Sequence, residues 1–209
     1  MILHGKIKKY LSNTRWFHAT TLDDWHEINK NGVIADYNKE TSAGLDFGYG
    51  FYMTNDNFKA EKFIYGLKKV DSLAKDDVMT IAEFTFSPLN WFEANKYNTY
   101  IINSHNDEFA NFVYENRMYN INGSKQHKYD VIFGVMTDTR PNKIIDEHKA
   151  GIIPKSVVLD EFKKSISMKQ LSLHNQKLCD MIKPVKAYVF EIDSENKTLR
   201  KELDQNGRT

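Results

Sequence analysis

The segment Leu45-Asp46-Phe47-Gly48-Tyr49-Gly50-Phe51-Tyr52-Met53-Thr54 constrains the fold more than any other stretch of this chain. Gly48 and Gly50 are separated by one residue. This spacing indicates a tight turn or a close approach of two backbones, because glycine lacks the Cβ that would prevent either. The alternative is an ordinary glycine turn with no ligand beside it. Phe51 to Thr54 then predicts a short strand.

Strands and helices alternate irregularly on both sides of this segment. Before it, residues 15–19 predict a strand. The helix predicted over 22–31 can be capped by Thr20 or Thr21 and ends at Gly32. After the segment, helices are predicted over 57–69, 107–118, 155–165 and 175–182, and strands over 78–86, 129–136, 170–174 and 186–192. Because the order is not a regular βαβ repeat, the predicted fold class is α+β.

Length and composition indicate an ordinary soluble protein. The 209 residues suit one domain, expected over 1–209 with a flexible charged tail over 194–209. The 29 basic and 28 acidic residues nearly cancel, which argues against a general nucleic-acid binder and leaves a local basic patch open. No signal-peptide core and no apolar run of about 18 residues is found, so we expect a cytoplasmic protein without a membrane partner. Secretion without an N-terminal signal stays open.

The number of cysteines and the spacing of the histidines argue against a metal site. Cys179 is the single cysteine, so an intrachain disulfide or a cysteine-based metal site cannot form. The histidines show no spacing typical of metal ligands. The sequence therefore predicts no metal.

Two motifs resemble those of poly-ADP-ribose-polymerase-like and diphtheria-toxin-like ADP-ribosyltransferases. Gly48 to Tyr52 is similar to their Gly-Lys-Gly-Ile-Tyr signature. His18, followed by Ala19 and Thr20, resembles their His-Gly-Ser/Thr motif. The order also agrees: an early histidine strand, a helix, a loop, the Gly-x-Gly-aromatic-Tyr strand and another helix. The resemblance implies an ADP-ribosyltransferase-like split β-sandwich with short peripheral helices.

A closer resemblance is to the DUF3990 group of bacterial ADP-ribosyltransferase-like domains. Residues 45–54 match its Leu-Asp-Phe-Gly-x-Gly-Phe-Tyr-x-Thr stretch, and residues 60–63 match the Ala-Glu-Lys-aromatic pattern that follows. Residues 129–134 match its Tyr-Asp-hydrophobic-hydrophobic-x-Gly strand, and residues 170–174 its late Gln-hydrophobic-Ser-hydrophobic-His segment. Each motif is weak by itself, and the ordered set is more specific.

The resemblance implies that the protein binds NAD and cleaves the bond between nicotinamide and ribose through an oxocarbenium-like ribose, much as glycosidases do. His18 would hydrogen-bond a ribose hydroxyl on the adenosine side. The backbone of Ala19, usually glycine in the family, would hold the nicotinamide carboxamide, and Thr20 of the same motif would also contact NAD. Tyr52 would stack on the nicotinamide ring, and Phe63 would form the second wall. The alternatives are a structural histidine at position 18 and a core-facing Phe63.

Gly48 and Gly50 would let the backbone turn closely around the same ligand. Ser172 and His174 share a strand face with Gln170, so they either line the cleft or cover the core. No nucleophile turn surrounds Ser172, so we expect no Ser-His-Asp triad.

The residue in the place of the catalytic acid is a glutamine. The resemblance puts Gln170 where the wider family has a glutamate that supports the ribose cation. Glutamine can bind the ribose and carries no charge. Glu161 and Glu191 are alternative acids, while Asp130 and Asp138 are candidates for supporting roles, with a strand-end cap and a turn as the competing interpretations.

The function expected from the resemblance is mono-ADP-ribosyl transfer from NAD to a protein, nucleic acid or small-molecule acceptor, in a bacterial toxin, effector or defence factor. Poly-chain formation is not expected without the late glutamate. The alternative is a non-enzymatic NAD or ADP-ribose-binding module, or a partner-binding scaffold, that retains the fold and lacks the acid.

Overall fold

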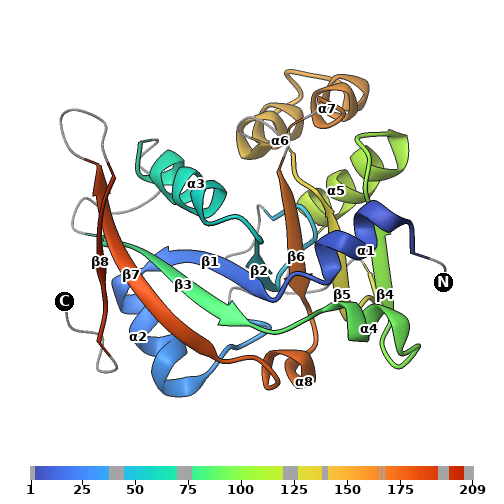
Figure 1. Ribbon diagram of the computed structural model, residues 1–209. Coiled ribbons are helices and arrows are strands. Elements are labelled where there is room, and N and C mark those ends of the chain that lie inside the picture. The colour runs from blue at the N-terminus through green and yellow to red at the C-terminus, as the bar shows by residue number, and fades with distance from the viewer. Residues whose placement is uncertain are drawn as a thin grey trace. The chain divides into compact units, whose positions relative to one another are not determined.

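The computed structural model describes residues 3–37, 45–69, 77–119, 127–137, 141–164, 166, 168–192 and 198–204 (Figure 1). Within them the chain forms eight helices and two four-stranded sheets, so the predicted α+β class is confirmed. The chain divides into two compact units. Unit 1 comprises 1–34, 53–95 and 179–209, and unit 2 comprises 35–52 and 96–178. The two units are thus interleaved along the sequence.

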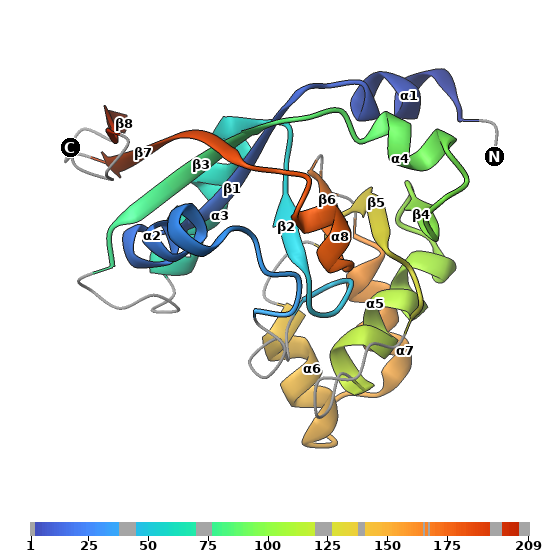
Figure 2. The same cartoon turned by 90° about the horizontal axis from the view of Figure 1, so that it is seen from below.

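Unit 1 is an antiparallel sheet with helices on both faces. Its strand order is β1-β3-β7-β8. The strands are β1 (Arg15–Thr21), β3 (Met79–Thr85), β7 (Pro184–Ile192) and β8 (Thr198–Glu202). The helices are α1 (Gly5–Leu11), α2 (Leu22–Asn31), α3 (Asn57–Lys69) and α4 (Leu89–Glu93). The two views place α2 and α3 on opposite faces of the sheet (Figures 1 and 2).

The face of unit 1 under α3 is an apolar core. Ala60 and Ile64 of α3 pack on Phe17, Ile81 and Phe190 of three neighbouring strands. Since side chains alternate along a strand, the residues between these point to the other face. This alternation fixes which residues of β1 face α3.

The predicted flexible tail is wrong for Thr198–Glu202, which form β8 along the edge of β7. An edge strand has unpaired backbone N–H and C=O groups, and β8 satisfies those of β7. Arg200 of β8 also donates from Nε and Nη2 to the buried carboxylate of Glu61, at 2.6 and 2.9 Å. The sequence prediction failed because this strand is held by backbone pairing with β7 and by the Arg200–Glu61 ion pair, and neither produces an alternating apolar pattern.

Unit 2 is a sheet with the order β2-β6-β5-β4, in which β5 pairs parallel with β4 and antiparallel with β6. The strands are β2 (Phe51–Met53), β4 (Thr99–Ile102), β5 (Val131–Val135) and β6 (Lys169–Leu173). The helices are α5 (Asp107–Tyr119), α6 (Pro141–Lys149), α7 (Lys155–Phe162) and the short α8 (Gln176–Cys179). Helices α5, α6 and α7 gather together (Figure 2), and their apolar side chains join Phe47 and Ile132 in one core.

No helix in the described part of the chain combines the length and apolar character that crossing a membrane requires.

Candidate functional site

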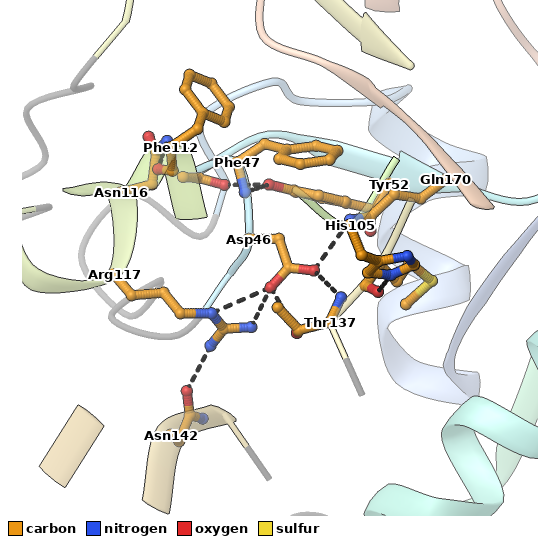
Figure 3. Close-up of polar contacts among 12 residues, drawn as sticks. Asp46, Phe47, Tyr52, His105, Phe112, Asn116, Arg117, Thr137, Asn142 and Gln170 are labelled. Atoms are coloured by element: carbon orange, nitrogen blue, oxygen red, sulfur yellow. Dashed lines mark hydrogen bonds and ion pairs between the residues drawn. The ribbon is translucent and has the colours of Figure 1, made fainter. Parts of the chain in front are cut away.

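Unit 2 contains a buried carboxylate, Asp46, at the start of the glycine-rich turn (Figure 3). Its Oδ1 accepts from Nη2 of Arg117 at 2.6 Å and from Nε at 3.1 Å. Both side chains are 5% exposed. A buried charge is tolerated only with a partner and further hydrogen bonds, so the two residues depend on each other.

Two more residues complete the shell of Asp46. The backbone N–H of Thr137 donates to Oδ2 and its hydroxyl to Oδ1, both at 2.8 Å. The side-chain amide of Gln170 donates to Oδ2 from Nε2 at 3.3 Å. On the far side of Arg117, Nη1 donates to Oδ1 of Asn142 at 2.7 Å. The carboxylate thus joins the glycine-rich segment to α5, the end of β5, and β6.

Tyr52 is fixed by the same turn. Its hydroxyl donates to the carbonyl of Gly48 at 2.5 Å and accepts from the N–H of Phe47 at 3.1 Å. Its ring stacks beside that of Phe47, with centroids 6.3 Å apart. Burial, followed by the nearby charge of Asp46, raises the pKa of Tyr52 well above its usual range. Tyr52 is therefore a neutral, rigidly oriented ring.

The two glycines of the turn are required by the backbone. Gly48 has φ of 76°, in the left-handed region that favours glycine. A Cβ on Gly50 would lie 2.6 Å from Nδ1 of His174 and 2.8 Å from the carbonyl oxygen of Leu173. Glycine is therefore required at position 50, because Leu173, the last residue of β6, and His174 lie too close to its backbone for a side chain to fit.

His174 connects the glycine-rich turn to Ser172 of β6. Its Nδ1 lies 2.6 Å from the carbonyl oxygen of Tyr49, and its Nε2 lies 2.8 Å from Oγ of Ser172. Since a carbonyl only accepts, Nδ1 carries the proton and Nε2 accepts from the hydroxyl. Ser172 is 0% exposed. Because Oγ is closed to solvent and the imidazole is oriented by a carbonyl, this pair positions the turn and has no access to a substrate.

The residues expected to contact NAD are divided between the units. Tyr52 and Gln170 lie in unit 2 with both turn glycines. His18, Ala19 and Thr20 lie on β1, and Phe63 lies on α3, in unit 1.

Within unit 1, His18 and Phe63 occupy different sides of the sheet. Phe17 and Ala19 pack toward α3, so alternation directs His18 to the opposite face, where it pairs across the strands with Ala82. Phe63 is 42% exposed, and the core face of its helix is formed by Ala60 and Ile64.

The alternative acids lie elsewhere. Glu161 on α7 pairs with Lys164, and Glu191 is exposed on β7 of unit 1. Asp130 accepts from the backbone N–H of Asn98 at 2.8 Å and from the amide of Asn175 at 2.7 Å, as a strand-end cap does. Asp138 lies outside the described residues. Across the described ranges, no three His, Cys, Asp or Glu side chains are grouped in a way that would hold a metal ion.

Comparison with known proteins gave one family. A family model described as "Protein of unknown function (DUF3990)" matches residues 27–183. The chain belongs to the DUF3990 family. Searches of the curated proteins and of the solved structures found no match. The DUF3990 region contains Asp46 and the three residues that donate to it, whereas His18 precedes it.

Arg117 and Thr137, which donate to Asp46, were not predicted from the sequence as site residues. A signal for Arg117 was present: it follows Phe109 and Val113 at steps of four residues, on the buried face of α5. A cation on an apolar helix face predicts a buried anion. Thr137 gave no comparable signal, because its role depends on where β5 ends in space.

Proposed function

We propose that this DUF3990 protein is an NAD-dependent mono-ADP-ribosyltransferase-like protein, which cleaves the nicotinamide–ribose bond and transfers ADP-ribose to an acceptor. The observation that carries the proposal is the pairing of β2 with β6. It brings Tyr52 and Gln170, which are distant in sequence, onto adjacent strands. The proposed reaction needs one residue against the nicotinamide and one at the ribose on either side of a single bond.

The hydrogen bond from Gln170 to Asp46 supports a role for the glutamine. It fixes the amide so that Nε2 faces the carboxylate and Oε1 faces away from it. No hydrogen bond to Oε1 is formed within the described residues. Donation to the carboxylate of Asp46 polarises the amide and makes Oε1 a stronger acceptor for a ribose hydroxyl. Asp46 would thus act through Gln170.

A second candidate is an NAD or ADP-ribose-binding module without turnover. It is favoured by the ion pair, because Arg117 neutralises Asp46 at 2.6 Å. Gln170 is itself neutral, so the site offers the ribose cation dipoles and no net negative charge. Charge-assisted hydrogen bonds are roughly twice as strong as neutral ones, and their absence lowers the expected rate.

The proposal extends to the cellular location, the biological role and the acceptor of the protein. The protein would act in the cytoplasm as a bacterial toxin, effector or defence factor. Its acceptor would be a protein, a nucleic acid or a small molecule, with NAD as the co-substrate and no metal.

The test is incubation with NAD labelled in the adenosine half, followed by chromatography for free nicotinamide and for labelled acceptor. We expect release that is abolished by Tyr52→Ala and reduced by Gln170→Ala. Tyr37→Ala, at a tyrosine of unit 2 that is 65% exposed, is the matched control and should retain the wild-type rate. Thermal melting of every variant separates loss of activity from loss of folding.

The two candidates give different outcomes. A rise in the melting temperature with NAD, but no nicotinamide release, would reject the transferase and support the binding module. No rise at about millimolar NAD would reject both, because a ligand that binds the native state must stabilise it.

A further inference from the structure

Unit 2 carries a pocket lined in part by aromatic side chains that pack against its core. It has a volume of about 450 Å³ and is lined by Asn98, Phe112, His127, Lys128 and Tyr129. Sites for small molecules in proteins span roughly 300–1,000 Å³. The pocket is therefore large enough for a ligand of small-molecule size.

Packed rings form one wall of the pocket. The ring of Phe112 lies 5.6 Å from that of His127 and 6.2 Å from that of Tyr129, between centroids. Tyr129 is stacked on Tyr100, at 4.5 Å and 7°, and on His127, at 5.6 Å and 28°. Such a wall offers flat apolar area whose side chains have little freedom left to lose on binding.

Two hydrogen bonds fix the histidine of this wall. His127 donates from Nε2 to the carbonyl of Phe47 at 2.8 Å, and its Nδ1 accepts from the N–H of Tyr129 at 3.2 Å. The first bond requires a proton on Nε2 and the second requires Nδ1 without one, so the ring is neutral and held in one orientation. Its anchor, Phe47, belongs to the glycine-rich segment.

Two polar side chains of the pocket, Asn98 and Lys128, are exposed. Within the described ranges, the ammonium of Lys128 and the side-chain amide of Asn98 make no hydrogen bond or ion pair. The nearest carboxylate in sequence, Asp130, has one oxygen bonded to the N–H of Asn98 and the other to Asn175, and it does not line the pocket. One cation, one amide and an aromatic wall are thus available together.

We propose that this pocket binds a purine mononucleotide. The base would lie on the ring of Phe112, at the edge of the stacked rings of His127 and Tyr129, since base–aromatic stacking is favourable for any flat base. The phosphate would pair with Lys128. Asn98 matches the edge of adenine, because an amide has one donor and one acceptor at the spacing of N7 and N6. The proposal is independent of the transferase activity, which does not involve these residues.

The test is calorimetric titration of the full chain with adenosine 5′-monophosphate. Adenosine and ribose 5-phosphate serve as probes that lack the phosphate or the base. We expect binding of the complete nucleotide, weaker binding of adenosine, and none of ribose 5-phosphate. Lys128→Glu should weaken the nucleotide by at least about tenfold, which is 1.4 kcal/mol. Lys149→Glu, an exposed lysine at the end of α6, makes the same charge change and should leave binding unaltered.

Three results would overturn the assignment: no binding of the nucleotide at about millimolar concentration, equal affinity of wild type and Lys128→Glu, or ribose 5-phosphate binding as tightly as the nucleotide. Phe112→Leu provides a second measurement, because it retains bulk and removes the ring; it should weaken the nucleotide and adenosine alike. Nicotinamide release from NAD by Lys128→Glu should equal that of wild type, so failure here and failure of the proposed function are distinguishable.

Discussion

Asp46→Ala is the substitution whose effect follows most directly from the geometry of unit 2. It removes the acceptor of Arg117, whose side chain is 5% exposed, together with the acceptor of two bonds from Thr137 and one from Gln170. Breaking a buried ion pair on one side costs about 3–5 kcal/mol, because an uncompensated charge is left in the interior. For a chain of this size, each kcal/mol lowers the melting temperature by about 2–4 °C, so the expected fall is roughly 6–20 °C.

The measurement is thermal and urea unfolding followed by circular dichroism. Lys8→Ala, which removes an exposed pair with Glu93, is the control and should leave the midpoint nearly unchanged. The double variant Asp46→Leu/Arg117→Met removes both charges and should recover part of the loss. A fall of less than about 1 kcal/mol for Asp46→Ala, or a double variant worse than the sum of its single variants, would refute the reasoning.

Three further substitutions test other contacts. Gly50→Ala should destabilise the protein measurably in the same assay, because its Cβ would lie 2.6 Å from the ring of His174. Burial raises the pKa of Tyr52, so the native state keeps a proton that the unfolded state loses near pH ~10, and stability falls as the pH rises further; Tyr52→Phe should flatten this fall in the unfolding midpoint. Gln170→Glu would place a second carboxyl beside Asp46, where Nε2 now lies 3.3 Å from Oδ2. The pKa of the introduced carboxyl would be raised in the folded state, so the loss of stability should be full at neutral pH and shrink toward about pH 4.

Each of these three predictions can be contradicted by a specific result. Gly66→Ala on α3 has nothing within 4 Å of the new Cβ and should be neutral or stabilising, so equal effects at both glycines would remove the steric explanation for Gly50. An unaltered alkaline slope in Tyr52→Phe would mean that this hydroxyl ionises normally. A Gln170→Glu variant with a pH-independent deficit would contradict the proximity of the two carboxyls.

Local signals predicted several elements closely. The helix predicted over 22–31 is α2, because Thr21 accepts from the N–H of Asp24 at 3.2 Å and Gly32 ends the helix with φ of 79°. The helix predicted over 57–69 has the bounds of α3. Caps and glycine stops act over a few residues, and a sequence pattern contains them in full.

Elements that depend on distant partners were missed. β4 (Thr99–Ile102) is short and is stabilised by parallel pairing with β5. β8 requires the free edge of β7 and the carboxylate of Glu61. α1, α4 and α6 were not predicted from periodicity either. The same limit applied to the site: Gln170 was expected on its strand, but its contact with Asp46 depends on how unit 2 folds.

The shell of Asp46 also has a kinetic consequence. Its partners lie 71, 91 and 124 residues further along the chain, so each contact closes a long loop. Closing long loops costs entropy before any contact compensates for it, so we expect these contacts to form after the transition state for folding. Loss of Asp46 should then accelerate unfolding in stopped-flow experiments far more than it slows refolding. The buried carboxylate that joins four segments of unit 2 would therefore govern how long the native state persists.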